Sequence, residues 1–156
     1  MYQIRQYAAG DARAIRQVFE SSVRSIGPQD YSTEQVTAWV SNGPNEESIQ
    51  TRCADGRITL LGLDEHGEVV AYIDLEPNGH IDHLYCSPQA AGTGLASTLY
   101  DQVETIARGR GDSRLFTEAS EAARRFFSRK GYALVRRREL NINGVPIHNF
   151  DLEKYL

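Results

Sequence analysis

Ile81-Asp-His-Leu-Tyr-Cys-Ser-Pro-Gln-Ala-Ala-Gly-Thr-Gly-Leu-Ala-Ser-Thr-Leu-Tyr-Asp-Gln-Val-Glu104 is the stretch that decides the fold. Pro88 has no N–H to donate to a sheet ladder, so the strand expected over His80–Cys86 ends just before it. Beyond the turn, apolar residues recur at helical spacing, which predicts a helix from Gly94 to about Arg108. The stretch therefore predicts a strand, a turn and a helix in succession.

Two glycines, Gly92 and Gly94, stand where the helix begins. Glycine lacks a Cβ, so a ligand can approach the backbone closely while the unpaired amide groups of the first helical turn point outward. Such a helix end attracts anions, and several N–H donors can converge on one phosphate. We expect a diphosphate here; the alternative is a glycine pair that only shapes a tight turn.

The segment Gln89–Gly94 resembles the Gln/Arg-x-x-Gly-x-Gly/Ala signature of the GNAT superfamily of N-acetyltransferases. In that family the signature holds the pyrophosphate of acetyl-CoA, and the preceding strand lies along the pantetheine arm. The resemblance implies cofactor contacts at Leu84, Tyr85, Cys86, Gln89, Ala90, Ala91, Gly92, Thr93, Gly94 and Leu95.

A dinucleotide-binding fingerprint, G-x-G-x-x-G, is the competing interpretation, because Gly92, Gly94 and Ser97 nearly fit it. That fingerprint follows its strand directly and expects an acidic residue about 20 residues later. Here Pro88 intervenes, and the residue at the later position is Arg114. The context therefore disfavours a dinucleotide-binding domain. Affinity for NAD rather than CoA would support that interpretation instead.

A second segment, Ala123–Tyr132, resembles the second GNAT signature, in which an aromatic pair on a helix precedes a glycine. The family usually has tyrosine four residues before that glycine, its hydroxyl near the leaving thiolate; this chain has Phe127. A water, Ser120 or Ser128 then serves as the acid, or the thiolate leaves unaided, which a thiol pKa of about 8.5 permits. The resemblance places further cofactor contacts at Ser120, Ala123, Phe126 and Phe127.

Candidate general bases come from the same resemblance. In the family, the strand before the first signature splays from its neighbour, which frees backbone N–H groups near Leu84 and Cys86 for the acetyl carbonyl and pantetheine arm. The base often lies two or four residues earlier, here Asp82 and His80. We expect His80, because an imidazole of pKa about 6.5 accepts a proton near neutrality. Glu118 is the third candidate; the alternative for each is an exposed residue without a catalytic role.

The resemblance covers about Tyr2–Glu153 and implies a mixed α/β (α+β) fold in one domain, residues 1–156. We expect a central, mostly antiparallel, splayed sheet of about six to seven strands flanked by helices. Strands are expected over residues 2–7, 57–63, 68–74, 80–86, 115–119, 133–140 and 147–154. Helices are expected after a capping Asp11, after a capping box at Ser32–Gln35, over residues 46–53, 94–108 and 121–130.

Composition narrows the partners. The net charge of −4 disfavours a surface that coats nucleic acid and suits a cationic amine substrate. Cys53 and Cys86 lie in no metal or disulfide pattern, so we expect reduced thiols and no metal. No apolar run approaches the roughly 18 residues of a membrane span, which favours a cytoplasmic protein without membrane contact. The terminal hairpin offers an edge for a possible homodimer.

The expected function is transfer of an acetyl group from acetyl-CoA to a primary amine of a small molecule or peptide, by direct attack in a ternary complex. The thioester is already activated, so the reaction needs a neutral amine and a polarised carbonyl. Because Phe127 lacks the usual hydroxyl, the alternative is a catalytically weak module that binds or senses acyl-CoA.

Overall fold

A computed structural model describes residues 1–156 and contains seven strands and five α-helices. The strands are β1 (Gln3–Gln6), β2 (Ile58–Leu63), β3 (Val69–Leu75), β4 (Leu84–Cys86), β5 (Arg114–Ala119), β6 (Ala133–Ile142) and β7 (Val145–Tyr155). The helices are α1 (Ala12–Ile26), α2 (Thr33–Asn42), α3 (Glu46–Cys53), α4 (Leu95–Gly109) and α5 (Glu121–Arg129), with short 3₁₀ turns at Gly27–Gln29 and Pro88–Ala90. The mixed α/β fold is confirmed. No helix has both the length and the apolar composition that crossing a membrane requires.

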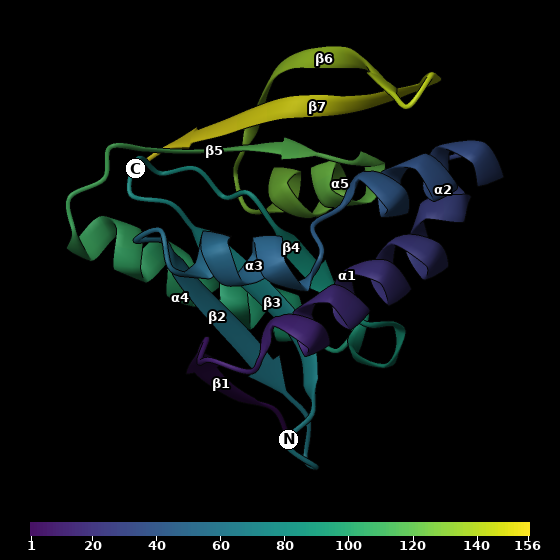
Figure 1. Cartoon of the computed structure of the whole chain (residues 1–156). Helices are drawn as coiled ribbons and strands as arrows, with labels where there is room; N and C mark the ends of the chain where they lie inside the picture. Colours follow the sequence, from purple (N-terminus) through teal and green to yellow (C-terminus); the bar gives the residue numbers. More distant parts are fainter.

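The strands form two antiparallel sheets, in the orders β1-β2-β3-β4 and β5-β7-β6 (Figure 1). They are joined by one parallel bridge between His80 and Phe116. At this bridge Ile81 N–H donates to Phe116 O (2.9 Å) and Phe116 N–H donates to Gly79 O (3.1 Å). Beyond it β4 and β5 pair with different neighbours and no longer with each other. This is the splayed, mostly antiparallel sheet that the family resemblance predicted.

The helices cover both faces of the sheet, because neighbouring strand residues point to opposite sides. Leu60 and Ile73 pack into a core with α4 and α5, whereas Leu61 and Tyr72 pack into a second core with α1, α2 and α3. In Figure 1, α1 and α2 lie beside the end of the sheet where β4 and β5 separate. Helices from both faces therefore reach the gap between these two strands.

The strand expected over His80–Cys86 is shorter in the structure, where only Leu84–Cys86 pairs, as β4. The cause is Asp74 on β3, whose Oδ1 accepts the backbone N–H groups of Asp82 (2.9 Å) and His83 (2.8 Å). A side-chain oxygen thus takes the place of a ladder carbonyl. Residues 80–83 therefore leave the regular ladder.

Two predicted helix starts had different outcomes. Ser32 and Gln35 form the complete capping box at the start of α2. Asp11 occupies the cap position of α1, but its carboxylate caps no amide of that helix. It accepts instead from Ala8 N–H (2.8 Å) and from Arg5. A nearby cation and a turn amide compete successfully for an aspartate that the sequence alone assigns to the helix.

The terminal hairpin turns at Asn143 and Gly144, as predicted, with φ angles of 51° and 83°. Both angles are left-handed, the conformation that a two-residue turn between antiparallel strands requires. The paired strands extend beyond the predicted bounds, to Ile142 on one side and from Val145 on the other. Cys53 and Cys86 are both free thiols, as expected.

Candidate active site

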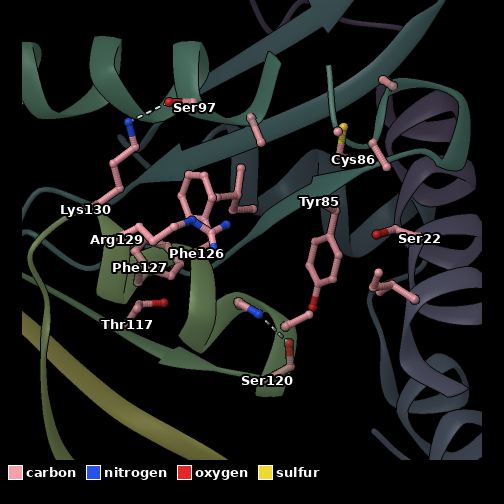
Figure 2. A pocket seen from close by; sticks show the side chains of 18 of the residues that line it. Ser22, Tyr85, Cys86, Ser97, Thr117, Ser120, Phe126, Phe127, Arg129 and Lys130 are labelled. Atoms are coloured by element: carbon pink, nitrogen blue, oxygen red, sulfur yellow. Dashed lines mark hydrogen bonds between the residues drawn. The ribbon is translucent and has the colours of Figure 1, made fainter. Parts of the chain in front are cut away.

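A cavity of about 530 Å³ occupies the gap between β4 and β5. Its walls come from β4, the loop before α4, the first turn of α4, the end of β5, α5 and the C-terminal end of α1 (Figure 2). Phe126 and Phe127 enter it from one side, and Tyr85 and Cys86 from β4. The two sequence motifs, more than 30 residues apart in the chain, therefore line one cavity.

Gly92 and Gly94 form the wall at the start of α4. Their φ angles are +75° and +87°, left-handed values that glycine adopts without strain. A Cβ at either position would meet no atom within 4 Å, so the space before this backbone is open. Gly94 is the N-cap of a 15-residue helix whose first turn has no side-chain cap. Uncapped amide groups facing open space are suited to a phosphate.

Most of the expected cofactor residues line the cavity: Leu84, Tyr85, Cys86, Ala90, Ala91, Gly92, Gly94, Ser120, Ala123, Phe126 and Phe127. Three do not. The Leu95 side chain is buried in the core, the Thr93 hydroxyl donates to Ala90 O (2.6 Å), and Gln89 is exposed. The side chains of Leu95 and Thr93 thus stabilise the core and the turn, and that of Gln89 points to solvent.

Backbone donors on β4 follow from the phase of its ladder with β3. Ser87 N–H donates to Val70 O (2.7 Å), and His83 O accepts from Asp74 N–H (3.1 Å). In an antiparallel pair, residues that exchange hydrogen bonds alternate with residues whose N–H groups point to the other edge. Leu84 and Cys86 occupy the alternate positions, so their N–H groups point into the gap. The free donors expected from the resemblance have this geometric basis.

Phe127 is 2% exposed and packs edge to face against Tyr132 (4.9 Å between ring centroids) while lining the cavity. Its ring closes the side of the cavity without offering a proton. Of the two hydroxyls considered as substitutes, Ser120 lines the cavity and Ser128 does not. Ser120 Oγ accepts from Ala123 N–H (3.3 Å) as the cap of α5, which leaves its own hydrogen free to donate.

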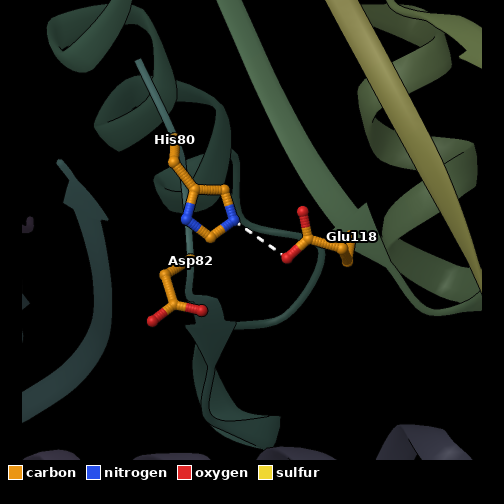
Figure 3. A group of neighbouring side chains, drawn as sticks. All are labelled: His80, Asp82 and Glu118. Atoms are coloured by element: carbon orange, nitrogen blue, oxygen red, sulfur yellow. Dashed lines mark hydrogen bonds and ion pairs between the residues drawn. The ribbon is translucent and has the colours of Figure 1, made fainter. Parts of the chain in front are cut away.

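The three candidate bases lie together: one side-chain atom each of His80, Asp82 and Glu118 falls within 4.8 Å of the others (Figure 3). Asp82 and Glu118 line the cavity, whereas His80 lies behind them. The bridge between His80 and Phe116 explains this arrangement, because it brings the start of the loop before β4 next to β5. Residues 38 apart in sequence become neighbours.

His80 has a carboxylate on each ring nitrogen. Nε2 lies 2.9 Å from Glu118 Oε1, and Nδ1 is bonded to Glu76 Oε2. Burial lowers the pKa of His80, but the hydrogen bonds to Glu118 and Glu76 and the negative charges of Glu118 and Asp82 outweigh it and raise the pKa to about 9. The expectation of titration near neutrality is corrected: at pH 7 this side chain is an imidazolium with both nitrogens occupied.

Asp82 is held by two arginines. Arg52 Nη2 bonds its Oδ2, and Arg57 Nη1 lies 3.2 Å from the same oxygen. Burial raises the pKa of Asp82, but the positive charges of these arginines hold it below its ordinary value. Asp82 thus has two guanidinium partners on one oxygen, whereas Glu118 has a single cationic partner, His80. Glu118 is the member of the cluster that both faces the cavity and carries no arginine.

The family model of the acetyltransferase (GNAT) domain matches residues 28–154 of the chain. The chain belongs to the GNAT family. It is 27% identical over 155 residues to the uncharacterised N-acetyltransferase YafP of Escherichia coli (strain K12), covering 95% of this chain and 92% of YafP. A GCN5-related N-acetyltransferase from Rhodopseudomonas palustris has a similar crystal structure, with a TM-score of 0.90, 33% identity and coverage of 99% of this chain and 95% of that one.

Solved relatives of lower identity show the same fold with the cofactor bound. PaiA N-acetyltransferase from Thermoplasma acidophilum, in complex with coenzyme A, superposes with a TM-score of 0.80 at 17% identity, covering 100% of this chain and 99% of that one. A phosphinothricin acetyltransferase from Sinorhizobium meliloti, in complex with acetyl-CoA, gives 0.76 at 19% identity, covering 99% and 88%. The GNAT protein described here is thus an acetyl-CoA-dependent N-acetyltransferase.

Two further cavities adjoin the main cavity of this acetyltransferase, and Trp39 and Tyr85 line all three. One, of about 370 Å³, lies beside Phe19 and Arg52; the other, of about 110 Å³, reaches Glu118. Their aromatic walls suit an apolar or cationic group.

Sequence reasoning missed three residues at the site. Arg129 and Lys130 line the cavity beside the start of α4, and Lys130 Nζ lies 2.6 Å from Ser97 Oγ. Two cations, one residue beyond the aromatic pair, were a signal for anion binding that the motif itself does not include. Glu76 gave no signal, because its contact with His80 exists only once the loop between them has closed.

The spacing of His80, Asp82 and Glu118 would also suit a cation. However, both nitrogens of His80 and the carboxylate of Asp82 already have protein partners. Neutral imidazole is the form that binds a metal, so a cation here would have to displace a proton from His80 and compete with these partners.

Proposed function

We propose that this enzyme transfers the acetyl group of acetyl-CoA to a primary amine of a small molecule or peptide, by direct attack in a ternary complex. The pyrophosphate binds the amide groups at Gly92 and Gly94, and the pantetheine arm follows β4. The observation that carries the proposal is that the β4 N–H groups and the Glu118 carboxylate face one continuous cavity. A carbonyl-binding edge and a proton acceptor then lie on opposite sides of the reacting carbon.

Glu118 is the proposed proton acceptor, directly or through one water. The nitrogen of the product amide is neutral, so the attacking amine must give up a proton to an acceptor during the reaction. Among the three clustered residues, His80 is already protonated and Asp82 is engaged by arginines, while Glu118 has a side chain 32% exposed toward the cavity. The imidazolium behind Glu118 keeps a positive charge beside the carboxylate.

The acetyl oxygen gains negative charge as the amine adds, and the N–H groups of Leu84 and Cys86 are placed to stabilise it. When the tetrahedral intermediate collapses, the C–S bond breaks and the thiolate leaves. Phe127 cannot protonate it, so Ser120 or a water does so, or the thiolate departs as the anion. The thiol of Cys86 stays neutral, because burial raises its pKa to about 11.

The test is release of free thiol from acetyl-CoA across a panel of amines, with Glu118→Gln as the variant. General-base assistance is typically worth about 10²–10⁴ in rate, so kcat/KM for the amine should fall by about that factor while the affinity for CoA stays unchanged. Glu139→Gln, an exposed glutamate on β6, is the matched control and should behave as wild type. A Glu118→Gln enzyme within threefold of wild type would refute the assignment.

Phe127 also supports a second candidate, an acyl-CoA-binding module with little turnover. CoA would then bind tightly while no amine in the panel accelerates thiol release. The two candidates therefore differ in one measurement, the ratio of turnover to cofactor affinity.

A further inference from the structure

A second carboxylate, Glu76, lies on the far side of His80 from the cavity. It follows β3 directly and reaches His80 across a tight turn in which Glu76 N–H donates to His80 O (2.8 Å) and His80 N–H donates to Asn78 Oδ1 (3.1 Å). Gly79 closes this turn with φ +91°, and a Cβ there would lie 2.2 Å from Arg114 O. Only glycine fits, so the turn is built to hold these two residues in register.

The carboxylate of Glu76 is fixed at both oxygens. Oε2 is bonded to His80 Nδ1, and Oε1 accepts from Arg57 Nη2 (3.4 Å). The Arg57 side chain is only 6% exposed and is itself held by Asp74 and Asp82. Glu76 is thus part of a partly buried ionic network that is anchored on β2 and β3.

The His80 ring connects Glu76 to the residues that line the cavity. Its ring stacks on Phe116 (4.9 Å between centroids, 21° between planes), so the directions of both nitrogens are set. With Nδ1 on Glu76, Nε2 points at Glu118 Oε1. The charged groups that face His80 are Glu76, Glu118 and Asp82, while Arg57 reaches it through Glu76.

We infer that Glu76 is a positioning residue for acetyl transfer: through the His80 ring it holds the Glu118 carboxylate at the cavity wall. This inference rests on the proposed role of Glu118. A neutral imidazole carries one N–H and can donate to only one of the two carboxylates. Because Glu76 helps keep the second proton on the ring, Glu118 retains an N–H donor that fixes its orientation.

Glu76→Gln tests this, because glutamine keeps the shape and removes the negative charge. Burial and the lost partner both act against the imidazolium, so the pKa of His80 should fall from about 9 by one unit or more. Above the new pKa the ring is neutral, and the donor to Glu118 is lost in part of the molecules. Below it the ring is charged, and Glu118 is held as in wild type.

Two measurements on the full-length enzyme follow. NMR titration of the four histidines gives the pKa of His80, assigned with His80→Gln. The ratio of kcat/KM for the amine, wild type over Glu76→Gln, is measured from pH 6 to 9. We expect a ratio near one at pH 6, because His80 is charged in both enzymes. At pH 8.5 a fall of one pKa unit leaves about a quarter of the rings charged, against about three quarters in wild type, so the ratio should grow to about threefold, and further if the pKa falls further. The KM for acetyl-CoA should not change.

Controls separate position from charge and from folding. Glu65→Gln, an exposed glutamate in the turn between β2 and β3, should match wild type at every pH. Glu76→Asp restores the charge and should recover part of the loss at pH 8.5. An unshifted His80 pKa, or a ratio that is flat with pH, overturns the inference. Absence of transfer by wild type overturns the proposed function instead, and with it the catalytic consequence of the pairing, even if the His80 pKa shifts as expected.

Discussion

Replacing Asp74 tests how the gap between β4 and β5 is made. Asp74 is 4% exposed and makes three hydrogen bonds: Oδ1 accepts the N–H groups of Asp82 and His83, and Oδ2 accepts from Arg57 Nη1 at 2.8 Å. Arg52 Nη2 also lies 3.9 Å from Oδ2. Asp74→Asn keeps the oxygen that accepts the two amides and removes the charge opposite Arg57. Asp74→Ala removes both carboxylate oxygens and therefore all of these interactions.

The two variants should differ by the value of the amide bonds. Removing one partner of a buried ion pair costs about 3–5 kcal/mol, but Arg57 retains Asp55, Asp82 and Glu76, so we expect about 2–3 kcal/mol for Asp74→Asn. Asp74→Ala also leaves two backbone N–H groups without an acceptor, each worth about 1–3 kcal/mol when buried. Its total loss in the free energy of unfolding should be about 4–9 kcal/mol.

The function should respond in the same order. With residues 80–83 released, the His80, Asp82 and Glu118 groups lose their common geometry, while the glycine turn before α4 is untouched. Urea unfolding gives the free energies, and calorimetry with CoA gives cofactor affinity. We expect kcat to fall more than CoA affinity in both variants. If Asp74→Ala unfolds too readily to assay, Asp74→Asn supplies the kinetic comparison.

Two outcomes would refute this reasoning about Asp74. The first is a difference between the Asn and Ala variants below about 1 kcal/mol, which would mean that the amide bonds do not hold the segment. The second is unchanged turnover in Asp74→Asn despite a clear loss of stability, which would separate the network from catalysis.

Three further predictions concern the cofactor and pH. Gly94→Glu should abolish measurable CoA binding in calorimetry without unfolding the protein. A glutamate at this left-handed position (φ +87°) would fill the open space in front of the helix end with a negative charge and repel the phosphates. Gly109→Glu, at the far end of α4, is the control and should bind CoA normally. Phe127→Tyr should keep or raise kcat by restoring a hydroxyl beside the leaving sulfur; a tenfold loss with CoA binding intact would exclude an acid at that position. The pKa of His80, raised to about 9, contributes stability that is complete below pH 6.5 and lost as pH rises to 9, at most about 3 kcal/mol. Burial lowers the pKa of His83 to about 4, so stability should also fall as pH drops from 6.5 to 4, and urea midpoints that are flat over both ranges would contradict these assignments.

The local features of this protein could be predicted from its sequence, because interactions between residues close together in the chain determine them. Pro88 has no N–H for the sheet ladder, and β4 ends at Cys86, just before it. The glycine pair before α4 predicts a helix end open to an anion. The Ser32–Gln35 capping box and the Asn143–Gly144 turn also formed as predicted, since each needs only residues within four positions. The two motifs, in order and at the right separation, were enough to identify the family.

The tertiary structure decided the electrostatics of the site. An isolated histidine side chain has an ordinary pKa. In the folded protein, the bridge to Phe116 and the turn from Glu76 place a carboxylate on each nitrogen of His80, which keeps the ring protonated at neutral pH. Asp74, an unremarkable position in a predicted strand, removes residues 80–83 from the ladder. Charge interactions depend on distance in space and on burial, and neither quantity can be read from positions along a chain.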